Sequence, residues 1–285
     1  MTESQSATEG ERIAKLIARA GVCSRREAET LVAQGRVAVD GDTLETPAVR
    51  VRPGQRVTID GELLPAVEQT RLWRLHKPRG VLTTAQDPQG RQTIYDGLPD
   101  EMPRVMPVGR LDLTSEGLLL LTNDGGLKRQ LELPATGWLR RYRVRVFGSV
   151  NERDLASLAD GLTVDGVSYG PVQARLDSTR GRNSWLTFAL REGKNREIRK
   201  LCEHLGYQVN RLIRVAYGPF QLGNLKEGHV EEVPSKILRE QLGNRLPQQP
   251  EKTRRPGRQA KPEREKPASR PARAPAAKSR RKTSP

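Results

Sequence analysis

The chain has little cysteine and no long apolar run. Only two of its 285 residues are cysteines, Cys23 and Cys202, and they lie far apart in the sequence. This usage suits a reducing compartment better than a disulfide-bonded secreted fold. No stretch approaches the ~20 apolar residues that cross a bilayer, and Met1–Gly10 is polar, without the apolar core of a signal peptide. We therefore expect a cytoplasmic protein with no membrane segment.

The sequence signatures of common cofactor and metal sites are also missing. There is no phosphate-binding glycine loop that ends in Lys-Ser or Lys-Thr, and no dinucleotide-binding glycine pattern follows a strand. The histidines His76, His204 and His229 are scattered, and neither cysteine has a neighbour at metal-ligand spacing. A serine nucleophile elbow is absent as well. Any catalysis is therefore expected to use carboxylate, tyrosine and arginine side chains, without a metal or an organic cofactor.

What the chain does have is positive charge, a net +16, which is concentrated at one end. Residues Glu251–Pro285 hold 13 Lys or Arg against three Glu, so this segment alone carries +10. It has six prolines and no aromatic residue, and we expect residues 247–285 to form a disordered tail that can bind phosphates. The excess indicates a polyanionic partner, either nucleic acid or an anionic membrane surface. Without a membrane segment, nucleic acid is the better interpretation.

Residues 11–66 are predicted to form a compact module of two helices and short strands. Ile13, Leu16 and Ile17 recur at helical spacing, and Ser24 with Glu27 has the form of a capping box before a second helix. Alternating valines from Val37 onward predict strands. The polar face of the helix pair is mostly basic. It is either a solvated helix surface, as most charged faces are, or a surface that contacts RNA.

The order of helix, GVCSRR, helix and GRVAVDG in this module resembles the S4 RNA-binding domain. The resemblance implies a small α-L fold that holds structured RNA. It places Arg25, Arg26 and Arg36 among the residues that contact the substrate.

The main domain is predicted to span residues 71–242. Six segments have strand character: 73–76, 118–122, 142–147, 172–176, 185–190 and 212–215. Helices are expected at 151–159 and 195–205, where apolar residues fall on one face. Many strands with few helices, and no regular alternation between them, indicate an α+β domain built on a mixed or antiparallel sheet.

The most informative segment runs from Gly109 to Gly125 and reads GRLDLTSEGLLLLTNDG. Its four leucines predict a strand that is buried on both faces. Asp112 precedes this strand in a loop, beside Arg110. A carboxylate next to a buried strand needs a cation or several N–H donors to remain ionised. On spacing alone, an ordinary Asp/Arg loop pair explains the segment slightly better than a catalytic site does.

This segment resembles the signature of the RsuA/RluB branch of pseudouridine synthases, with Glu116 before the glycine as a departure. RYRVRVFG at 141–148 and EGKNREIRK at 192–200 are similar to two further motifs of that family. The resemblance implies that Asp112 is the nucleophile, that Tyr142 stacks on the target base and assists proton removal, and that Arg199 forms an ion pair with Asp112. The remaining implied substrate contacts are Arg110, Lys194, Asn195 and Arg196. Taken alone, Tyr142 could be an ordinary half-buried strand residue and the basic run a solvated helix start.

The resemblance covers both domains, roughly residues 11–242, and includes HKPRG at 76–80, DPQGR at 87–91 and RLIRV at 211–215. With the basic tail, these segments are most similar to members of the branch that modify large-subunit (23S) ribosomal RNA. The same reaction on small-subunit RNA or transfer RNA stays open, as does a non-catalytic role in ribosome assembly. We expect a monomer that acts on ribosomal RNA, free or in an assembly intermediate.

Overall fold

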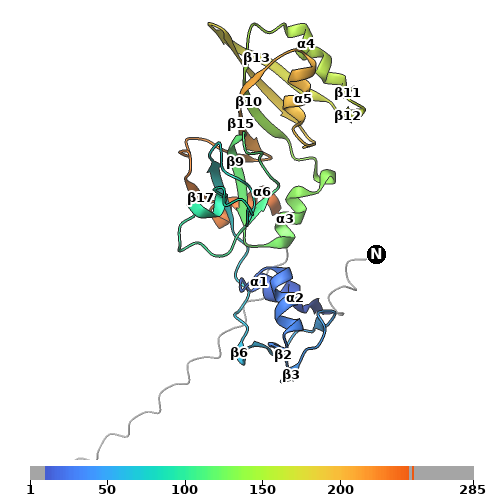
Figure 1. Cartoon of the computed structure of the whole chain (residues 1–285), viewed down its shortest axis with the longest axis vertical. Helices are drawn as coiled ribbons and strands as arrows, with labels where there is room; N and C mark the ends of the chain where they lie inside the picture. The colour runs from blue at the N-terminus through green and yellow to red at the C-terminus, as the bar shows by residue number, and fades with distance from the viewer. Residues whose placement is uncertain (1–9, 244–245, 247–285) are drawn as a thin grey trace, which may run out of the picture. The chain divides into compact units, whose positions relative to one another are not determined.

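A computed structural model of the protein describes residues 10–243 and 246 (Figure 1). The tail predicted at 247–285 lies outside these residues. The structure confirms an α+β chain: a small helical and strand region is followed by a region built on one large mixed sheet. No helix in the described part of the chain has the length and apolarity needed to cross a membrane. Both cysteines, Cys23 and Cys202, are free thiols.

The N-terminal region contains the two predicted helices and short strands. Its elements are β1 (Glu11–Arg12), α1 (Ile13–Arg19), α2 (Arg25–Ala33), β2 (Val37–Val39), β3 (Asp42–Thr43), β4 (Arg50–Val51), β5 (Val57–Ile59) and β6 (Glu62–Leu63). The predicted capping box is confirmed, because the Glu27 N–H donates to Ser24 Oγ at 3.2 Å and the Ser24 N–H donates to Glu27 Oε2 at 2.7 Å. Ile13 and Ile17 of α1 pack against Ala28 and Val32 of α2 in a separate small core.

In the described part of the second region, nine strands form one sheet. These are β7 (Leu72–Lys77), β8 (Met106–Val108), β9 (Glu116–Thr122), β10 (Arg140–Phe147), β13 (Val172–Arg180), β14 (Asn183–Leu190), β15 (Val209–Tyr217), β16 (Phe220–Gln221) and β17 (Val230–Glu232). The main order is β13-β14-β10-β15-β9-β7-β17. The pairing of β15 with β9 is parallel and joins two antiparallel halves. Every residue of β9 is buried, as its leucine run predicts.

Gly117 explains why β9 and β15 can approach each other. It adopts φ +103, and a Cβ atom at this position would collide with the backbone of Arg214. Only glycine adopts this conformation at low cost and leaves room for the neighbouring backbone. The parallel pairing of β9 with β15, which joins the two halves of the sheet, therefore depends on Gly117.

Helices and turns complete the region, and several were not predicted. The set comprises α3 (Gly125–Glu132), α4 (Glu152–Ala156), α5 (Glu197–His204), α6 (Ser235–Leu242), the hairpin β11 (Leu162–Val164) and β12 (Val167–Tyr169), and 3-10 turns at Ile94–Gly97, Pro134–Thr136 and Ser157–Asp160. The predicted helix at 151–159 is divided into α4 and a 3-10 turn. The helix predicted at 195–205 begins only at Glu197, because Arg196 has a left-handed backbone with φ 52.

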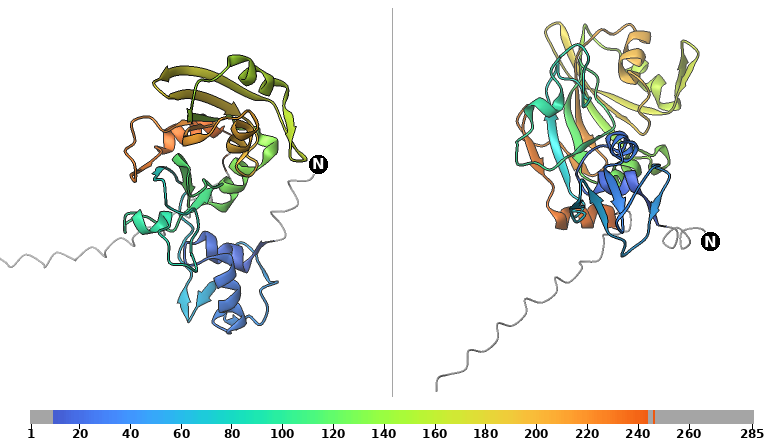
Figure 2. Two further views of the ribbon diagram at one scale, coloured as in Figure 1. Left: turned by 45° about the horizontal axis from the view of Figure 1, so that its top comes forward. Right: turned by 60° about the horizontal axis from the view of Figure 1, so that its bottom comes forward.

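The two faces of the β13–β14–β10 half of the sheet differ. Alternate residues of β10, namely Tyr142, Val144 and Val146, belong to a core that also includes Leu155 of α4 and Leu201 of α5. Figure 1 and Figure 2 show α4 and α5 on that side of the strands. The other face, which carries Arg141, Arg143 and Arg145 of β10, belongs to none of the described hydrophobic cores.

Candidate active site

The loop between β8 and β9 carries Asp112, and its backbone is held at several points. The Gly109 N–H donates to Glu132 Oε1 at 2.6 Å, and Thr83 Oγ1 donates to the Leu111 carbonyl at 2.9 Å. The Gly80 N–H donates to the Leu113 carbonyl at 2.8 Å. These contacts come from three separate segments of the chain, so the position of Asp112 is set before any ligand binds.

Lys77, the last residue of β7, is the central anchor of this loop. Its ammonium group is fully buried and donates to the carbonyls of Pro78 (2.9 Å), Asp112 (3.3 Å) and Ser115 (3.0 Å). Burial lowers the pKa of Lys77 to about 8, while the negative charges of Asp112 and Glu116 act in the opposite direction. A buried cation thus lies directly behind the loop that presents the carboxylate.

Asp112 lines a cavity of about 390 Å³. Tyr142 lines the same cavity from β10, so the structure brings together two of the three predicted catalytic residues. The Asp112 carboxylate is partly exposed and, within the described residues, takes part in no hydrogen bond or ion pair. Its backbone is fixed and its side-chain oxygens are free to meet a ligand. This combination suits a nucleophile or an anionic contact.

Cationic side chains also line this cavity. Arg214 of β15 is buried and donates from Nε to the Leu118 carbonyl at 2.7 Å, while its Nη2 is buried without a hydrogen-bond partner. Arg140 of β10 stacks over the Tyr217 ring at 4.8 Å and donates to the Tyr217 hydroxyl at 3.1 Å. These cations make the cavity favourable for a ligand with carbonyl or phosphate oxygens.

Arg199, the predicted ion-pair partner of Asp112, makes contacts with the backbone in this structure. In the described structure no ion pair within 4.0 Å joins it to Asp112. Instead, its guanidinium donates to the carbonyls of Thr114 (3.0 Å) and Val209 (3.4 Å). It lines a neighbouring cavity near Tyr207. Burial lowers the pKa of Arg199, repulsion from Arg196 lowers it further, and attraction from Asp112 raises it. Arg199 therefore supports the Asp112 loop through hydrogen bonds to the backbone, and its positive charge attracts the Asp112 carboxylate electrostatically. The direct ion pair between the two side chains stays a prediction.

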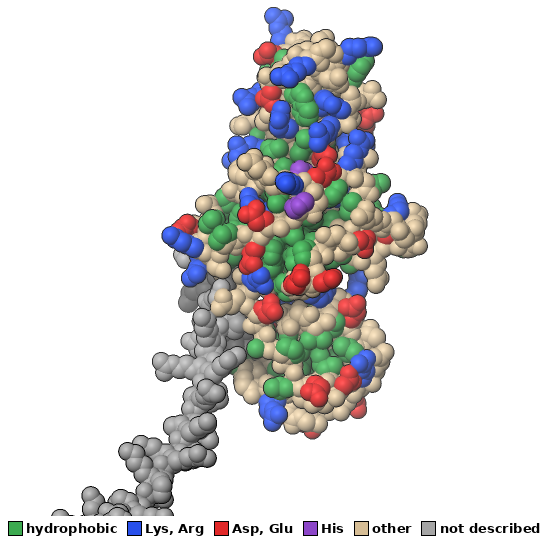
Figure 3. Space-filling view, turned by 90° about the vertical axis from the view of Figure 1, so that its left-hand side faces the viewer, with side chains coloured by type: hydrophobic (Ala, Val, Ile, Leu, Met, Phe, Trp, Pro, Cys, Tyr) green, Lys and Arg blue, Asp and Glu red, His purple; other side chains and the backbone are tan. Residues whose placement is uncertain are grey.

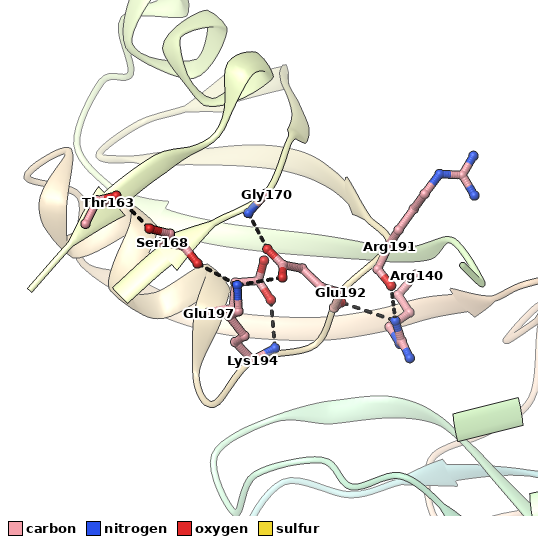
Figure 4. A network of polar contacts seen from close by, with 8 residues as sticks. All are labelled: Arg140, Thr163, Ser168, Gly170, Arg191, Glu192, Lys194 and Glu197. Carbon is pink, nitrogen blue, oxygen red and sulfur yellow. Dashed lines mark hydrogen bonds and ion pairs between the residues drawn. The ribbon is translucent and has the colours of Figure 1, made fainter. Parts of the chain in front are cut away.

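The loop at 191–196, between β14 and α5, is tied down by a polar network (Figure 4). Glu192 accepts a hydrogen bond from the Gly170 N–H and forms an ion pair with Lys194 at 2.7 Å. Lys194 also donates to the carbonyl of Ser168, which belongs to β12 of the β11–β12 hairpin. Arg140 donates to the carbonyls of Arg191 and Glu192. The loop and the hairpin are thus fastened to each other at the rim of the cavity.

Glu197, the first residue of α5, also lines this cavity and is almost fully buried. Its Oε2 accepts from the Lys194 N–H at 2.9 Å, whereas Oε1 is buried without a partner. Burial raises the pKa of Glu197 to about 7. The folded protein therefore binds more protons than the unfolded chain between pH 4.5 and about 7, and its stability falls as the pH rises through this window.

We expect Glu197→Gln to remove this pH dependence. The amide oxygen can still accept from Lys194, and no charge is buried above pH 7. Relative to wild type, the unfolding free energy should rise by about 2 kcal/mol at about pH 8 and change little at about pH 4.5. Urea unfolding at both pH values measures this, with the exposed Glu203→Gln as the control. A variant that shows the wild-type slope would contradict the shifted pKa.

The predicted RNA contacts are divided between free and engaged side chains. Arg110, Asn195 and Arg196 are exposed, line the cavity, and have no carboxylate partner among the described residues. The left-handed backbone of Arg196 is costly for a non-glycine residue, as is often found at functional sites. By contrast, the ammonium group of Lys194 is committed to Glu192.

The N-terminal region shows the same division. Arg25 and Arg26 are exposed at the start of α2 and have no acidic partner in the described part of the chain. Arg36 donates both Nε and Nη2 to Asp60, at 2.8 and 2.6 Å. Lys15 and Arg19 also pair with Glu11. The helix face is thus less free of acidic partners than its sequence indicates, and the three predicted RNA contacts there stay predictions.

Four cavity or anchor residues were not singled out from the sequence: Lys77, Arg140, Glu197 and Arg214. The sequence could have identified Lys77, because this charged residue occupies an inward position of a strand in which Leu72, Trp73 and Leu75 are apolar. The sequence could have identified Arg214 in the same way, because it lies between buried apolar positions of β15. Charged residues in the inward register of a strand are rare and mark sites where specific partners are present.

Comparison with known proteins identifies the family of both regions. Residues 71–204 match the family model described as RNA pseudouridylate synthase, and residues 11–57 match the S4 domain. An uncharacterized RNA pseudouridine synthase of Rickettsia typhi is 45% identical over 235 residues, 82% of this chain and 96% of that protein. A solved crystal structure of a pseudouridylate synthase superimposes with a TM-score of 0.57 at 25% identity and covers 81% of this chain and 99% of that one.

The fold is therefore that of an enzyme that isomerises uridine in RNA. The chain belongs to the RNA pseudouridine synthase family and carries an S4 domain that binds RNA. A further relative, the ribosomal large subunit pseudouridine synthase B of Haemophilus influenzae, is 40% identical over 251 residues, 84% of this chain and 70% of that protein.

Proposed function

We propose that this enzyme converts a specific uridine of 23S ribosomal RNA to pseudouridine, with Asp112 as the nucleophile and no cofactor. The observation that carries the proposal is the Asp112 carboxylate, which is free of protein partners in the described structure and is presented to a cavity shared with Tyr142. The S4 domain supports an RNA substrate, and the name of the Haemophilus relative supports the choice of large-subunit RNA.

The reaction breaks the N1–C1′ bond of uridine, rotates the base, and joins C5 to C1′ with loss of the C5 proton. Asp112 bonds covalently to the nucleotide, at either C1′ of the ribose or C6 of the base, so the intermediate stays in the cavity. This bond breaks again in the course of the reaction, which regenerates the carboxylate, and N1 of the product takes up a proton in exchange for the one lost from C5. The uridine first leaves its stack, which costs a few kcal/mol, and stacking on Tyr142 offsets part of this cost. Tyr142 then assists removal of the C5 proton.

The cations around the cavity position the nucleotide. Arg199 and Lys77 hold the backbone of the Asp112 loop from two sides. Arg110 and Arg196 at the rim are placed to contact phosphates, which orient an RNA without selecting its base. Base selection then falls to the inner wall of the cavity, where Arg214 has an unsatisfied donor.

Removing the gene from its host should abolish one pseudouridine of 23S ribosomal RNA, since the enzyme is proposed to act at a single position. Chemical mapping of pseudouridine across both ribosomal RNAs and transfer RNA measures this. Wild-type protein should restore the site, and Asp112→Asn should not. Loss of a site in small-subunit or transfer RNA would replace the proposed target, and an unchanged map would favour a non-catalytic role in ribosome assembly.

A further inference from the structure

A second surface lies on the opposite side of the sheet from Tyr142. In β10, the residues that alternate with the buried Tyr142, Val144 and Val146 point to the other face. They include Arg141, Arg143 and Arg145. Together with Trp185, Phe147 and Arg182 these residues form a patch that we name the arginine face. Figure 3 looks onto this side, where Lys and Arg side chains surround apolar ones in the upper part.

Strand register brings the members of the arginine face together. Arg145 is opposite Trp185 of β14 on one side and opposite Arg211 of β15 on the other. The guanidinium groups of Arg143 and Arg145 lie over the Trp185 ring, at 4.7 and 5.9 Å from its centre. Arg182, in the turn between β13 and β14, lies over Phe147 at 4.9 Å. Stacking on the rings keeps the guanidinium groups along the surface with hydrogen-bonding capacity left over.

The charge of these arginines is not neutralised by the protein. In the described part of the chain, no carboxylate lies within 4.0 Å of the guanidinium of Arg141, Arg143, Arg145 or Arg182. Arg145 Nε is also buried without a hydrogen-bond partner. Other arginines nearby are paired: Arg175 with Asp177, and Arg211 with Glu116. Unpaired guanidinium groups on one sheet face, next to partly exposed rings, are therefore a local feature and not the general state of this surface.

We propose that the arginine face binds a segment of the RNA substrate outside the nucleotides that enter the cavity. Phosphates would pair with the guanidinium groups, and a base would stack on Phe147, whose side chain is 43% exposed. Aromatic rings interleaved with cations are the usual platform for single-stranded nucleic acid, because every base has a face that stacks. The inference goes beyond the proposed function, since the sheet separates this surface from Asp112 and no catalytic step requires it.

Binding to a uridine-free RNA of ~12 nucleotides tests this surface without the reaction. The variant is Arg143→Gln/Arg145→Gln in the full chain. The control is Arg74→Gln/Lys236→Gln, which removes two charges that lie beside Glu231 and Glu240. We expect the first variant to bind about tenfold more weakly at ~100 mM salt, and the slope of log K against log salt to fall by about 1.4, the value for two lost phosphate contacts on a single strand. The control should stay near wild type.

Equal losses in both variants would show a general charge effect and overturn the proposal. A third variant, Phe147→Leu, separates RNA from an acidic protein segment as the partner. It should weaken binding of the oligonucleotide but not of a polyglutamate peptide, whereas equal effects on both would overturn the assignment to RNA. The rate on a minimal stem–loop substrate should be unchanged in all three variants. Failure of the proposed 23S target would leave these binding results intact, so the two proposals can be lost separately.

Discussion

Asp112→Asn is expected to lower the rate of pseudouridine formation at least about a thousandfold while RNA binding stays near wild type. The amide has the shape of the carboxylate but cannot form the covalent bond to the nucleotide. The fold should be unaffected, because in the described structure the carboxylate makes no hydrogen bond that asparagine would lose. Release of tritium from RNA that carries C5-labelled uridine measures the rate, and filter binding of the same RNA measures affinity.

The control for this variant is Asp100→Asn, which removes one negative charge from an exposed position outside the cavity. It should keep the wild-type rate. Normal tritium release by Asp112→Asn would remove the nucleophile and with it the proposed mechanism. Loss of both rate and binding would instead assign Asp112 a role in holding the RNA.

Local sequence patterns predicted most of the elements that build this site. The strand predicted at 142–147 lies within β10, and the four leucines identified β9 as buried on both faces. These patterns succeed because burial repeats with the period of the backbone itself. In β10 this periodicity gives Tyr142 and Arg143 different surroundings, the first buried and the second exposed.

Contacts between distant segments could not be read in the same way. Lys77 reaches the Asp112 loop because β7 pairs with β9 so that Lys77 is opposite Gly117. Arg214 enters the cavity because β15 runs parallel to β9 across that same glycine. A parallel pairing between segments roughly a hundred residues apart leaves no local periodicity. For Arg199 and Asp112 the resemblance indicates proximity, whereas the partner of each guanidinium nitrogen depends on the fold.

Lys77→Met is expected to lower the rate about a hundredfold, the scale of a misplacement of roughly 1 Å at a reacting group. The thioether side chain fills a similar volume but leaves the carbonyls of Pro78, Asp112 and Ser115 without their donor. The unfolding free energy should change less than the rate, because the loss of three hydrogen bonds and the removal of a buried charge have opposite signs. Tritium release and urea unfolding measure the two quantities, with the exposed Lys226→Met as the control.

The pH dependence of the unfolding free energy distinguishes loss of the Lys77 ammonium group from a packing defect, because a packing defect does not change it. Burial lowers the pKa of Lys77 from 10.5 in the unfolded chain to about 8 in the folded protein. Between these values the unfolded chain binds more protons, so wild-type stability should gain a contribution that increases from about pH 8 to 10.5. Lys77→Met should lack this rise, and Lys226→Met should keep it. A slow variant that keeps the rise would show that another group titrates there, whereas a fast variant without it would show that the buried ammonium does not position Asp112.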